Sequence, residues 1–258
     1  SYNNWMDTDG ALGVVSEFDK TCVVIIKHAA PCGVGIGENI LDAFKKAQSC
    51  DALSAFGGII SSNREIDLAT AEEINKSFFE VVIAPGYAED ALAKLKEKKN
   101  LRVLEAKPEL FSPPDYMKCY SVIGGVLMQQ NDFSMENPDG WEVVSKRKPS
   151  PEELEDLDFA WRVVKWVKSN AIVLAKGLKT IGIGTGQPSR VDSVEISILK
   201  AKKHGHETKG SVLASDAFFP FRDSVDKAKE AGVTAIVEPG GSVRDNEVVE
   251  AANQHDIA

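Results

Sequence analysis

The sequence predicts an α/β fold in which short buried strands alternate with amphipathic helices. Apolar runs such as residues 23–26 have the length of strands that are covered on both faces. Segments with helical spacing, such as residues 40–47, follow these runs along the chain. Motifs of the first half also recur in the same order in the second half, which predicts two copies of one strand, turn and helix unit.

The elements of the first half follow from periodicity and from proline and glycine positions. Pro31 is expected to stop strand pairing, and Gly33, Gly35 and Gly37 to let the backbone bend close to a ligand. Asp67 is a suitable N-cap for the helix that follows it. The expected helices cover residues 6–20, 40–47, 67–77 and 88–99, and the expected strands cover residues 23–26, 51–61 (interrupted by Gly57-Gly58), 80–86 and 101–104.

A polar, proline-bearing stretch at residues 105–120 divides the chain, so we expect subdomains at 1–115 and 116–258. Ser150, Pro151 and Glu153 form a capping box that begins a helix extending to about residue 169. A strand at residues 171–175 follows it, and residues 256–258 resemble the beginning of another strand. Both ends of the chain are expected to lack pieces.

Four matches, about 150–160 residues apart, define the expected repeat. They are Ile25-Ile26-Lys27 with Leu174-Ala175-Lys176, Gly35-Ile36-Gly37 with Gly182-Ile183-Gly184, Ala55-Phe56 with Ala217-Phe218, and residues 82–86 with 236–240. Two related copies predict a functional site where they meet.

Composition excludes several classes of protein. The 258 residues carry a formal net charge of −9, which disfavours nonspecific binding to nucleic acid or to an anionic membrane. No apolar run approaches the roughly 20 residues of a membrane-spanning helix. The four cysteines form no C-x-x-C pair, so we expect reduced thiols in a cytoplasmic protein.

Lys27 and His28 follow a buried strand directly, and ligands of open α/β sheets bind beyond the carboxyl ends of strands. A neighbouring ammonium group favours the neutral imidazole that a general base requires. The alternative interpretation is a solvated pair at the end of a strand. The other histidines, His204, His206 and His255, lie in polar stretches and are expected at the surface.

Two segments of the second half are candidates for ligand binding. Glycines at 182, 184 and 186 precede Arg190, which is typical of an anion site, although an ordinary turn has the same pattern. Residues 216–223 place three phenylalanines among two carboxylates and an arginine, which suits a planar heterocycle or a corner of the core.

The segment around His28 contains part of the zinc deaminase signature, which is H-x-E followed by P-C-x-x-C. Ala30 stands at the position of the glutamate, and Gly35 at that of the second cysteine. The ligand set is incomplete, so no catalytic zinc or other metal is expected.

Taken together, these motifs resemble the AICAR transformylase/IMP cyclohydrolase family of purine biosynthesis, and specifically its formyltransferase half. AICAR is 5-aminoimidazole-4-carboxamide ribonucleotide. The resemblance covers essentially the whole chain. It rests on Lys27-His28-x-x-Pro31-Cys32-Gly33, Ser54-Ala-Phe56-Gly57-Gly58, Val82-Ile-Ala-Pro85, Lys168-Ser169-Asn170, Gly184-Thr-Gly186-Gln187-x-Ser189-Arg190, residues 214–221 and Pro239-Gly-Gly-Ser242.

The resemblance implies a tandem pair of cytidine-deaminase-like three-layer α/β/α subdomains without zinc. It also implies transfer of a formyl group from 10-formyltetrahydrofolate, the co-substrate, to the 5-amino group of AICAR. His28 would be the general base, assisted by Lys27 and Asn170. Ring closure to IMP is not expected from this chain.

The remaining site residues are likewise implied by the resemblance. AICAR would contact Gly57, Glu80, Arg190 and Phe218, and the folate would contact Val191, Asp223, Ser242 and Val243. Family members are homodimers with sites across the subunit interface, so the same is expected here. Two alternatives stay open: a catalytically silent domain that binds AICAR or folate or only dimerises, and a deaminase-like hydrolase.

Overall fold

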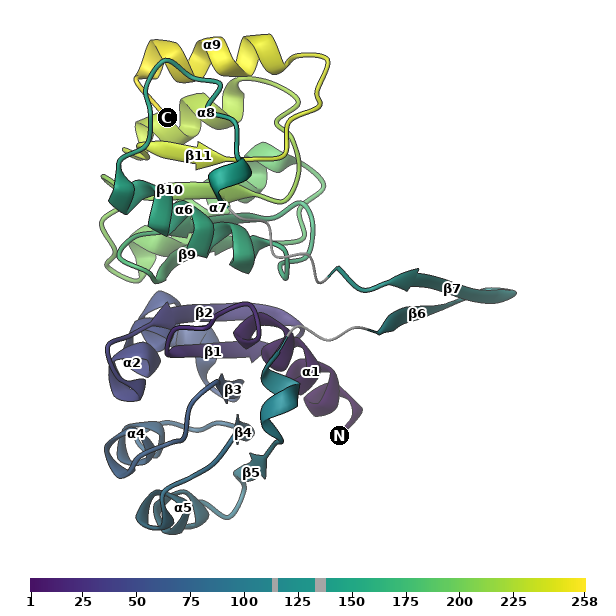
Figure 1. The fold of residues 1–258 in the computed structure, drawn as a ribbon, viewed down its shortest axis with the longest axis vertical. Helices are drawn as coiled ribbons and strands as arrows, with labels where there is room; N and C mark the ends of the chain where they lie inside the picture. The colour runs from purple at the N-terminus through teal and green to yellow at the C-terminus, as the bar shows by residue number, and fades with distance from the viewer. Residues whose placement is uncertain (113–115, 133–137) are drawn as a thin grey trace.

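The computed structural model describes residues 1–112, 116–132 and 138–258. These residues form two mixed α/β halves and a β-hairpin that extends from the side of the molecule (Figure 1). The α/β class predicted from the sequence is confirmed. The predicted boundary after residue 115 adjoins residues 113–115, which lie outside the described residues, and it stays a prediction.

Helices and strands alternate along most of the chain, and strand β2 occupies the stretch that was expected to be a glycine turn. The first half contains α1 (Tyr2–Val15), β1 (Cys22–Lys27), β2 (Ala30–Ile36), α2 (Ile40–Cys50), α3 (Ala52–Ala55), β3 (Ile59–Ser62), α4 (Leu68–Ile74), β4 (Val81–Ala84), α5 (Glu89–Lys96) and β5 (Arg102–Glu105). The hairpin consists of β6 (Met117–Val122) and β7 (Gly125–Gln130). The second half contains α6 (Pro151–Val164), β8 (Ile172–Ala175), β9 (Thr180–Gly184), α7 (Arg190–Lys203), β10 (Val212–Ser215), α8 (Asp223–Glu230), β11 (Ala235–Val237) and α9 (Asp245–His255).

The two main sheets share one strand pattern. The first has the order β2-β1-β3-β4-β5, and the second has β9-β8-β10-β11. In each sheet the first two pairings are antiparallel and the next is parallel. The backbone of Ala258 adds hydrogen bonds to Thr234 and Ile236 beside β11. The strand order therefore confirms that the chain contains a structural repeat.

Details of the first hairpin recur in the second. The register of β1 and β2 shifts after Ile25, and that of β8 and β9 shifts after Leu174. Lys27 donates from Nζ to the carbonyl of Phe56, while Lys176 donates to that of Lys209. These contacts confirm that the two lysines are equivalent.

The same register corrects two of the predicted matches. Ile25 pairs with Gly33 and Leu174 pairs with Gly182, so Gly33 is the counterpart of Gly182, and the predicted glycine match was two residues out. Phe56 corresponds to Lys209, because both accept from equivalent lysines; Phe218 instead follows β10. The match of residues 82–86 with 236–240 is confirmed, since Val82 and Ile236 occupy equivalent positions beside Ile60 and Leu213.

Several element predictions need correction. Pro31 does not stop pairing; it lies within β2 opposite Ile26, at the register shift, where a missing N–H is tolerated. The expected strand at residues 51–61 is the short helix α3 followed by β3, because Asp51 caps a helical turn. The helix that starts with the Ser150 capping box ends at Val164 rather than near residue 169. The Asp67 and Ser150 caps are confirmed.

The glycine-rich stretches let helices approach strands, which differs from the predicted ligand loops. A Cβ atom on Gly33 would lie 1.9 Å from the Ala47 carbonyl of α2. A Cβ atom on Gly184 would lie 1.9 Å from the Ser193 carbonyl of α7. Cβ atoms on Gly35 and Gly182 would lie 2.7 Å and 2.1 Å from carbonyl oxygens of the same two helices. Close helix packing thus accounts for these glycines.

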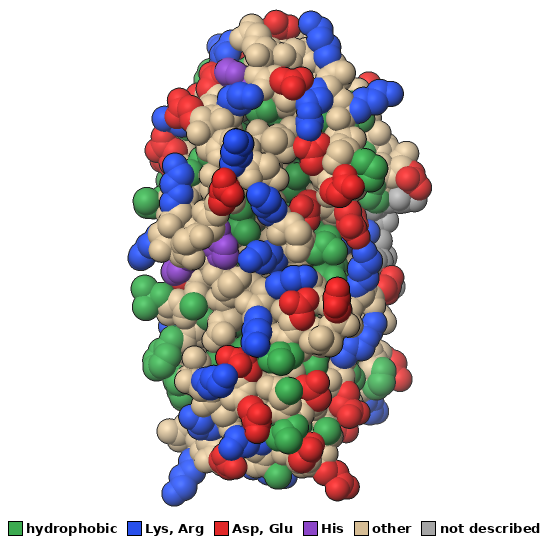
Figure 2. Space-filling model, turned by 90° about the vertical axis from the view of Figure 1, so that its left-hand side faces the viewer, with side chains coloured by type: hydrophobic (Ala, Val, Ile, Leu, Met, Phe, Trp, Pro, Cys, Tyr) green, Lys and Arg blue, Asp and Glu red, His purple; other side chains and the backbone are tan. Residues whose placement is uncertain are grey.

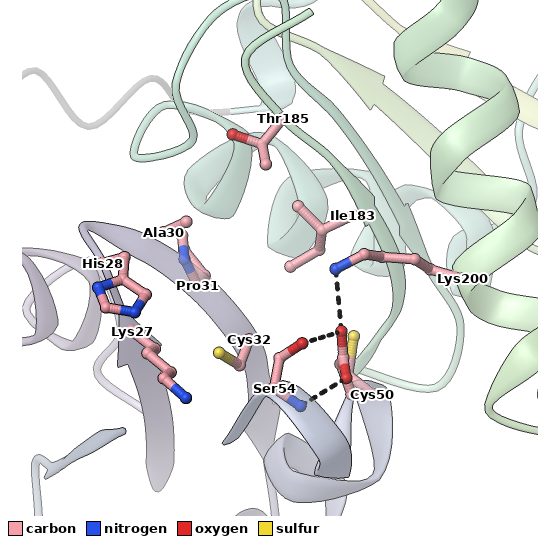
Figure 3. A pocket seen from close by; sticks show the side chains of 11 residues that line it. Lys27, His28, Ala30, Pro31, Cys32, Cys50, Ser54, Ile183, Thr185 and Lys200 are labelled. Atoms are coloured by element: carbon pink, nitrogen blue, oxygen red, sulfur yellow. Dashed lines mark hydrogen bonds and ion pairs between the residues drawn. The ribbon is translucent and has the colours of Figure 1, made fainter. Parts of the chain in front are cut away.

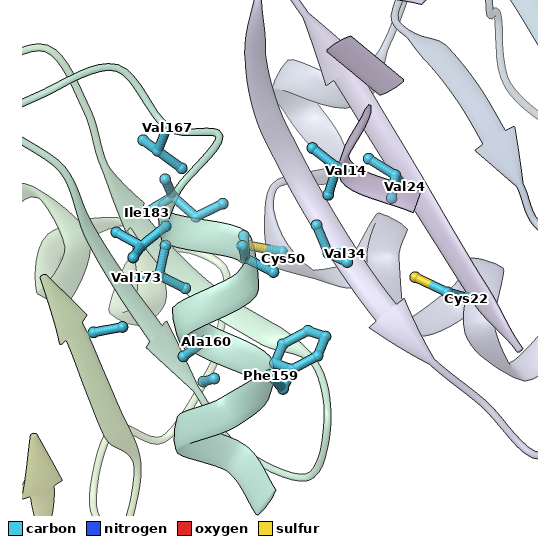
Figure 4. Packing of buried hydrophobic residues seen from close by; sticks show 14 of the residues in the cluster. Val14, Cys22, Val24, Val34, Cys50, Phe159, Ala160, Val167, Val173 and Ile183 are labelled. Atoms are coloured by element: carbon cyan, nitrogen blue, oxygen red, sulfur yellow. The ribbon is translucent and has the colours of Figure 1, made fainter. Parts of the chain in front are cut away.

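Helices cover both faces of each sheet. Val23 and Ile25 face the cluster formed with α2, α4 and α5, while Val24 and Ile26 face the cluster that contains α1. The latter cluster continues into the second half through Phe159 of α6, so one core spans both halves (Figure 4). α7, α8 and α9 cover the opposite face of the second sheet.

The edges of the two sheets meet at strands β2 and β9. The Val34 N–H donates to Thr180 Oγ1 at 3.0 Å, and the Ile36 N–H donates to the Leu178 carbonyl at 2.9 Å. Gly35 and Lys179 form an antiparallel bridge. On the face shown in Figure 2, basic and acidic side chains are interspersed. Within the described ranges, no helix combines the length and the apolar character needed to cross a membrane.

Candidate active site

His28 lies at the tip of the tight turn between β1 and β2. It and Ala29 have φ angles of +54° and +57°, as in the two-residue hairpins of type I′. The Asp7 carboxylate accepts hydrogen bonds from the His28 N–H at 2.9 Å and the Ala29 N–H at 2.6 Å. Helix α1 therefore fixes the turn, and the His28 side chain is exposed.

Lys27 is held beside the segment that precedes β3. Its Nζ donates to the Phe56 carbonyl at 2.7 Å. The next residue, Gly57, has a φ of +76° and donates from its N–H to the Phe78 carbonyl at 2.8 Å. The Glu80 N–H donates to the Gly58 carbonyl at 3.0 Å, and the Glu80 carboxylate pairs with Arg102. The structure thus brings together the predicted residues Lys27, Gly57 and Glu80.

A pocket of about 260 Å³ opens where the two halves meet (Figure 3). The first half supplies Lys27 and His28 to its wall, and the second half supplies Ile183, Thr185 and Lys200. The rest of the wall consists of Ala30, Pro31, Cys32, Cys50, Asp51 and Ser54. Burial raises the pKa of the Cys32 and Cys50 thiols to about 12, so both stay protonated at neutral pH.

A second cluster surrounds the buried guanidinium of Arg190, the first residue of α7. It donates to Asp216 Oδ1 at 2.6 Å, to Ser215 Oγ at 2.8 Å and to Asn170 Oδ1 at 2.5 Å. The Asn170 amide donates to the carbonyls of Gln187 and Pro188. Asn170 is therefore bonded at both its amide oxygen and its amide nitrogen.

Asp216 is ionised in this cluster. Burial disfavours its charge, but hydrogen bonds from Arg190, Ser169 and the Ala171 N–H outweigh that effect and lower the pKa of Asp216. For Glu238, at the end of β11, burial is the dominant cause and raises the pKa. Arg190 and Asp216 thus form an ion pair. The Glu238 carboxyl group binds a proton more readily than an ordinary glutamate does.

The remaining predicted residues lie in the second half, on loops or in the first turns of helices. Val191 follows Arg190 in α7, and Phe218 lies in the loop after β10 with 42% of its surface exposed. Asp223 begins α8, while Ser242 and the exposed Val243 lie between β11 and α9. The Arg244 guanidinium stacks 4.7 Å from the centre of the Phe221 ring, which brings these two loops together.

The antiparallel junction explains which predicted residues approach one another. Because β2 and β9 run in opposite directions, the His28 turn lies near the end of β9 rather than near its own counterpart, Gly177. Thr185 follows β9 and lines the pocket, and the neighbouring Gln187 holds Asn170. Within the described part of the chain, the other predicted residues of the second half do not line this pocket.

Sequence reasoning missed two acidic residues that organise the pocket, Asp7 and Asp51. The repeat could have revealed the role of Asp7, because an aspartate, Asp156, occupies the equivalent position in the second half. Asp156 accepts hydrogen bonds from the N–H groups of Gly177 and Leu178. His204, His206 and His255, which were expected at the surface, are partly buried, and each has a polar partner. His204 contacts Asp51, His206 donates from Nε2 to the Ser49 carbonyl, and His255 contacts Asp226.

The described residues contain no group of three or more His, Cys, Asp or Glu side chains arranged to hold a metal ion. All four cysteines are free thiols, of which Cys119 is exposed.

Comparison with known proteins places the chain in a family. A model of the AICARFT/IMPCHase bienzyme family matches residues 1–200. The chain belongs to this family. Its curated relatives include proteins named "Bifunctional purine biosynthesis protein PurH". The one from Desulfitobacterium hafniense is 51% identical over 254 residues, which is 98% of this chain and 48% of the relative.

Two further relatives with the same name are similar over the whole chain. The protein of Persephonella marina is 50% identical over 261 residues, and that of Aquifex aeolicus is 49% identical over 259 residues. Each match covers 100% of this chain and 50% of the relative. The chain therefore spans about half the length of the curated relatives it matches.

Proposed function

We propose that this chain carries the formyltransferase activity of a bifunctional purine biosynthesis protein. The observation that supports the proposal most is the pocket between the halves, which Lys27 and His28 line. These residues belong to the Lys27-His28-x-x-Pro31-Cys32-Gly33 motif that resembles the formyltransferase half of the family. Membership of the AICARFT/IMPCHase family supports a reaction of purine biosynthesis.

The reaction would join the 5-amino nitrogen of AICAR to the formyl carbon of 10-formyltetrahydrofolate. His28 takes the proton of the attacking amine, which is a weak nucleophile because its lone pair is conjugated with the imidazole ring. The bond from the formyl carbon to N10 breaks, and N10 receives a proton. The products are formyl-AICAR and tetrahydrofolate.

Lys27 would stabilise the negative charge that develops on the formyl oxygen during attack. Asn170 and Arg190 would bind AICAR together with Gly57, Glu80 and Phe218. Because Asn170 already accepts from Arg190 and donates to two carbonyls, its assistance would include holding the Gln187 loop beside the pocket. The folate would contact Val191, Asp223, Ser242 and Val243.

The proposal includes the finer fold assignment and the quaternary structure. The shared strand order of the two sheets supports a tandem pair of cytidine-deaminase-like subdomains. The exposed apolar side chains of the hairpin, among them Ile123 and Leu127, support a homodimer. Four free thiols suit the reducing cytoplasm.

Turnover of the two substrates tests the proposal. The purified chain is incubated with AICAR and 10-formyltetrahydrofolate, and release of tetrahydrofolate is followed by absorbance. We expect turnover that His28→Ala lowers at least about 100-fold. Lys27→Met should also lower it, whereas Lys176→Met, the equivalent substitution in the other half, should not.

Other outcomes point to the alternatives. Equal turnover in the wild-type and His28→Ala proteins would contradict the role of His28. Binding of AICAR or folate without turnover, even with the adjoining segments of the relatives restored, would favour a silent binding domain. Formation of IMP from formyl-AICAR would assign the family's other activity to this chain. Release of ammonia from nucleosides would favour a deaminase.

A further inference from the structure

Asp51 joins helix α7 of the second half to the first half at the wall of the pocket. Lys200 Nζ donates to Asp51 Oδ2 at 2.9 Å, and His204 Nε2 lies 3.1 Å from Oδ1. The Asp51 side chain is 7% exposed, and that of His204 is 13% exposed. Both contacts cross the junction between the halves, and Figure 3 shows the Lys200 contact inside the pocket.

The same carboxylate begins helix α3. Asp51 Oδ1 accepts from the Ser54 N–H at 2.9 Å, and Oδ2 accepts from the Ser54 hydroxyl at 2.7 Å. The Ala55 N–H bonds to the Asp51 carbonyl at 2.9 Å, which closes the turn. Asp51 therefore sets where this four-residue helix starts and in which direction it continues.

The far end of α3 holds Lys27. The helix ends at Ala55, and the carbonyl of the next residue, Phe56, accepts the hydrogen bond from Lys27 Nζ at 2.7 Å. A shift of α3 would move this carbonyl and with it the ammonium group. Lys176 makes the equivalent bond to Lys209, which lies in a turn that no helix like α3 precedes. The link from a junction carboxylate to the lysine is thus specific to the first half.

Helix α7 contributes at both of its ends. Its first residue is Arg190, which holds Asn170 and Asp216, and Lys200 lies ten residues later, about 15 Å along the axis. A rigid helix of this length fixes the distance between the two clusters. The pocket and the Arg190 cluster therefore share one positioning element.

We propose that Asp51, held by Lys200 and His204 of α7, is a positioning residue that aims the Lys27 ammonium at the pocket. The expected effect of Asp51 on turnover rests on the proposed function, whereas its expected effect on the position of the Lys27 ammonium group does not. Asp51 touches neither His28 nor the backbone of its turn, which Asp7 holds. Its effect on the reaction passes through Lys27.

The structural arm of the test observes Lys27 directly. The full chain is reductively methylated with ¹³C-formaldehyde, and the Lys27 resonance is assigned by its loss in Lys27→Arg. We expect this resonance to shift in Asp51→Ala and in Lys200→Met. Asp67→Ala is the matched control, because Asp67 caps α4 through the Thr70 N–H and has no path to Lys27. A Lys27 resonance unchanged in both junction variants overturns the proposal.

The kinetic arm asks whether Asp51 acts through Lys27. Asp51→Asn retains a capping oxygen, so the fold is kept, and an unchanged urea midpoint verifies this. We expect its kcat to fall about tenfold, equivalent to about 1.4 kcal/mol, with little change in KM for AICAR. In a Lys27→Met background the same substitution should cost nothing further.

The outcomes of the two arms separate the two proposals. Additive losses from Asp51→Asn and Lys27→Met show that Asp51 acts elsewhere and overturn its positioning role. A wild-type chain without formyl transfer contradicts the proposed function, and the resonance of Lys27 then still decides whether Asp51 positions it.

Discussion

His28 occupies a backbone conformation that its counterpart Gly177 adopts at lower cost. Left-handed φ values are unfavourable for most side chains, and Asn tolerates them better than His does. We predict that His28→Asn raises the free energy of unfolding by up to about 1 kcal/mol. The same substitution should lower the proposed formyl transfer at least about 100-fold, because it removes the proposed base. Urea unfolding and turnover measured on one preparation check both results.

The turn of the second half provides the control for this prediction. Leu178 has a φ of +56° and lies outside the pocket, so Leu178→Asn relieves the same conformation without touching His28. It should leave turnover unchanged. A His28→Asn protein less stable than wild type would show that the histidine side chain contributes to folding.

Asp216 should make the fold sensitive to acid. Its folded-state pKa lies below the ordinary value of about 3.9, so its contribution to stability is complete above that pH. The contribution is lost as the pH falls through the folded-state value. Asp216→Asn should cost about 3 kcal/mol at pH 7, because Arg190 stays buried without its carboxylate.

Urea unfolding between pH 2 and pH 7 measures this effect. The difference in stability between wild type and Asp216→Asn should shrink below about pH 4. A difference that stays constant over this range would contradict the role assigned to the ion pair.

At the scale of single elements, helices pack so closely on β2 and β9 that the glycines of these strands cannot be replaced without loss of stability. Gly33→Ala would place Cβ 1.9 Å from a backbone carbonyl of α2, and backbone cannot rotate away as a side chain does. We predict a loss of about 3 kcal/mol or more in the free energy of unfolding. Gly125→Ala in β7 is the control, since nothing lies within 4 Å of the added atom, and it should stay within about 0.5 kcal/mol. Equal stability of the two variants would contradict the packing.

Elements that depend on local signals could be predicted from the sequence. The Ser150 capping box and the Asp67 cap mark helix starts through bonds within four residues, and both were found. The role of Gly33 depends on α2, and the place of Asp51 at the wall of the pocket depends on Lys200 of α7. Such contacts join distant parts of the chain, so glycine spacing alone suggested a ligand loop.

At the scale of the whole molecule, the repeat could be predicted from the sequence, but the arrangement of the site between its two copies could not. Order and spacing identified Lys27 with Lys176, while the direction in which β2 meets β9 has no local sequence signal. That direction places His28 near Thr185 instead of near its own counterpart. Motif order could therefore name candidate residues, but only the junction shows which of them share a pocket.

The shared core leads to a prediction about unfolding of the entire chain. Val14, Val34, Phe159 and Ile183 belong to one buried cluster, so neither half can lose its structure without exposing apolar surface of the other. We expect calorimetry to show one transition in which both halves unfold together.

Thr180→Val tests the coupling at its centre. The Thr180 hydroxyl accepts from the Val34 N–H and donates to the Val34 carbonyl across the junction. Valine has a similar shape but satisfies neither group, which costs about 1–3 kcal/mol. Because the halves unfold as one unit, the single midpoint should fall by about 5 °C without splitting. Two separate transitions in the wild-type protein would show instead that the halves unfold independently. A Thr180→Val midpoint equal to that of wild type would show that this hydrogen-bonded junction contributes little to the stability of the chain.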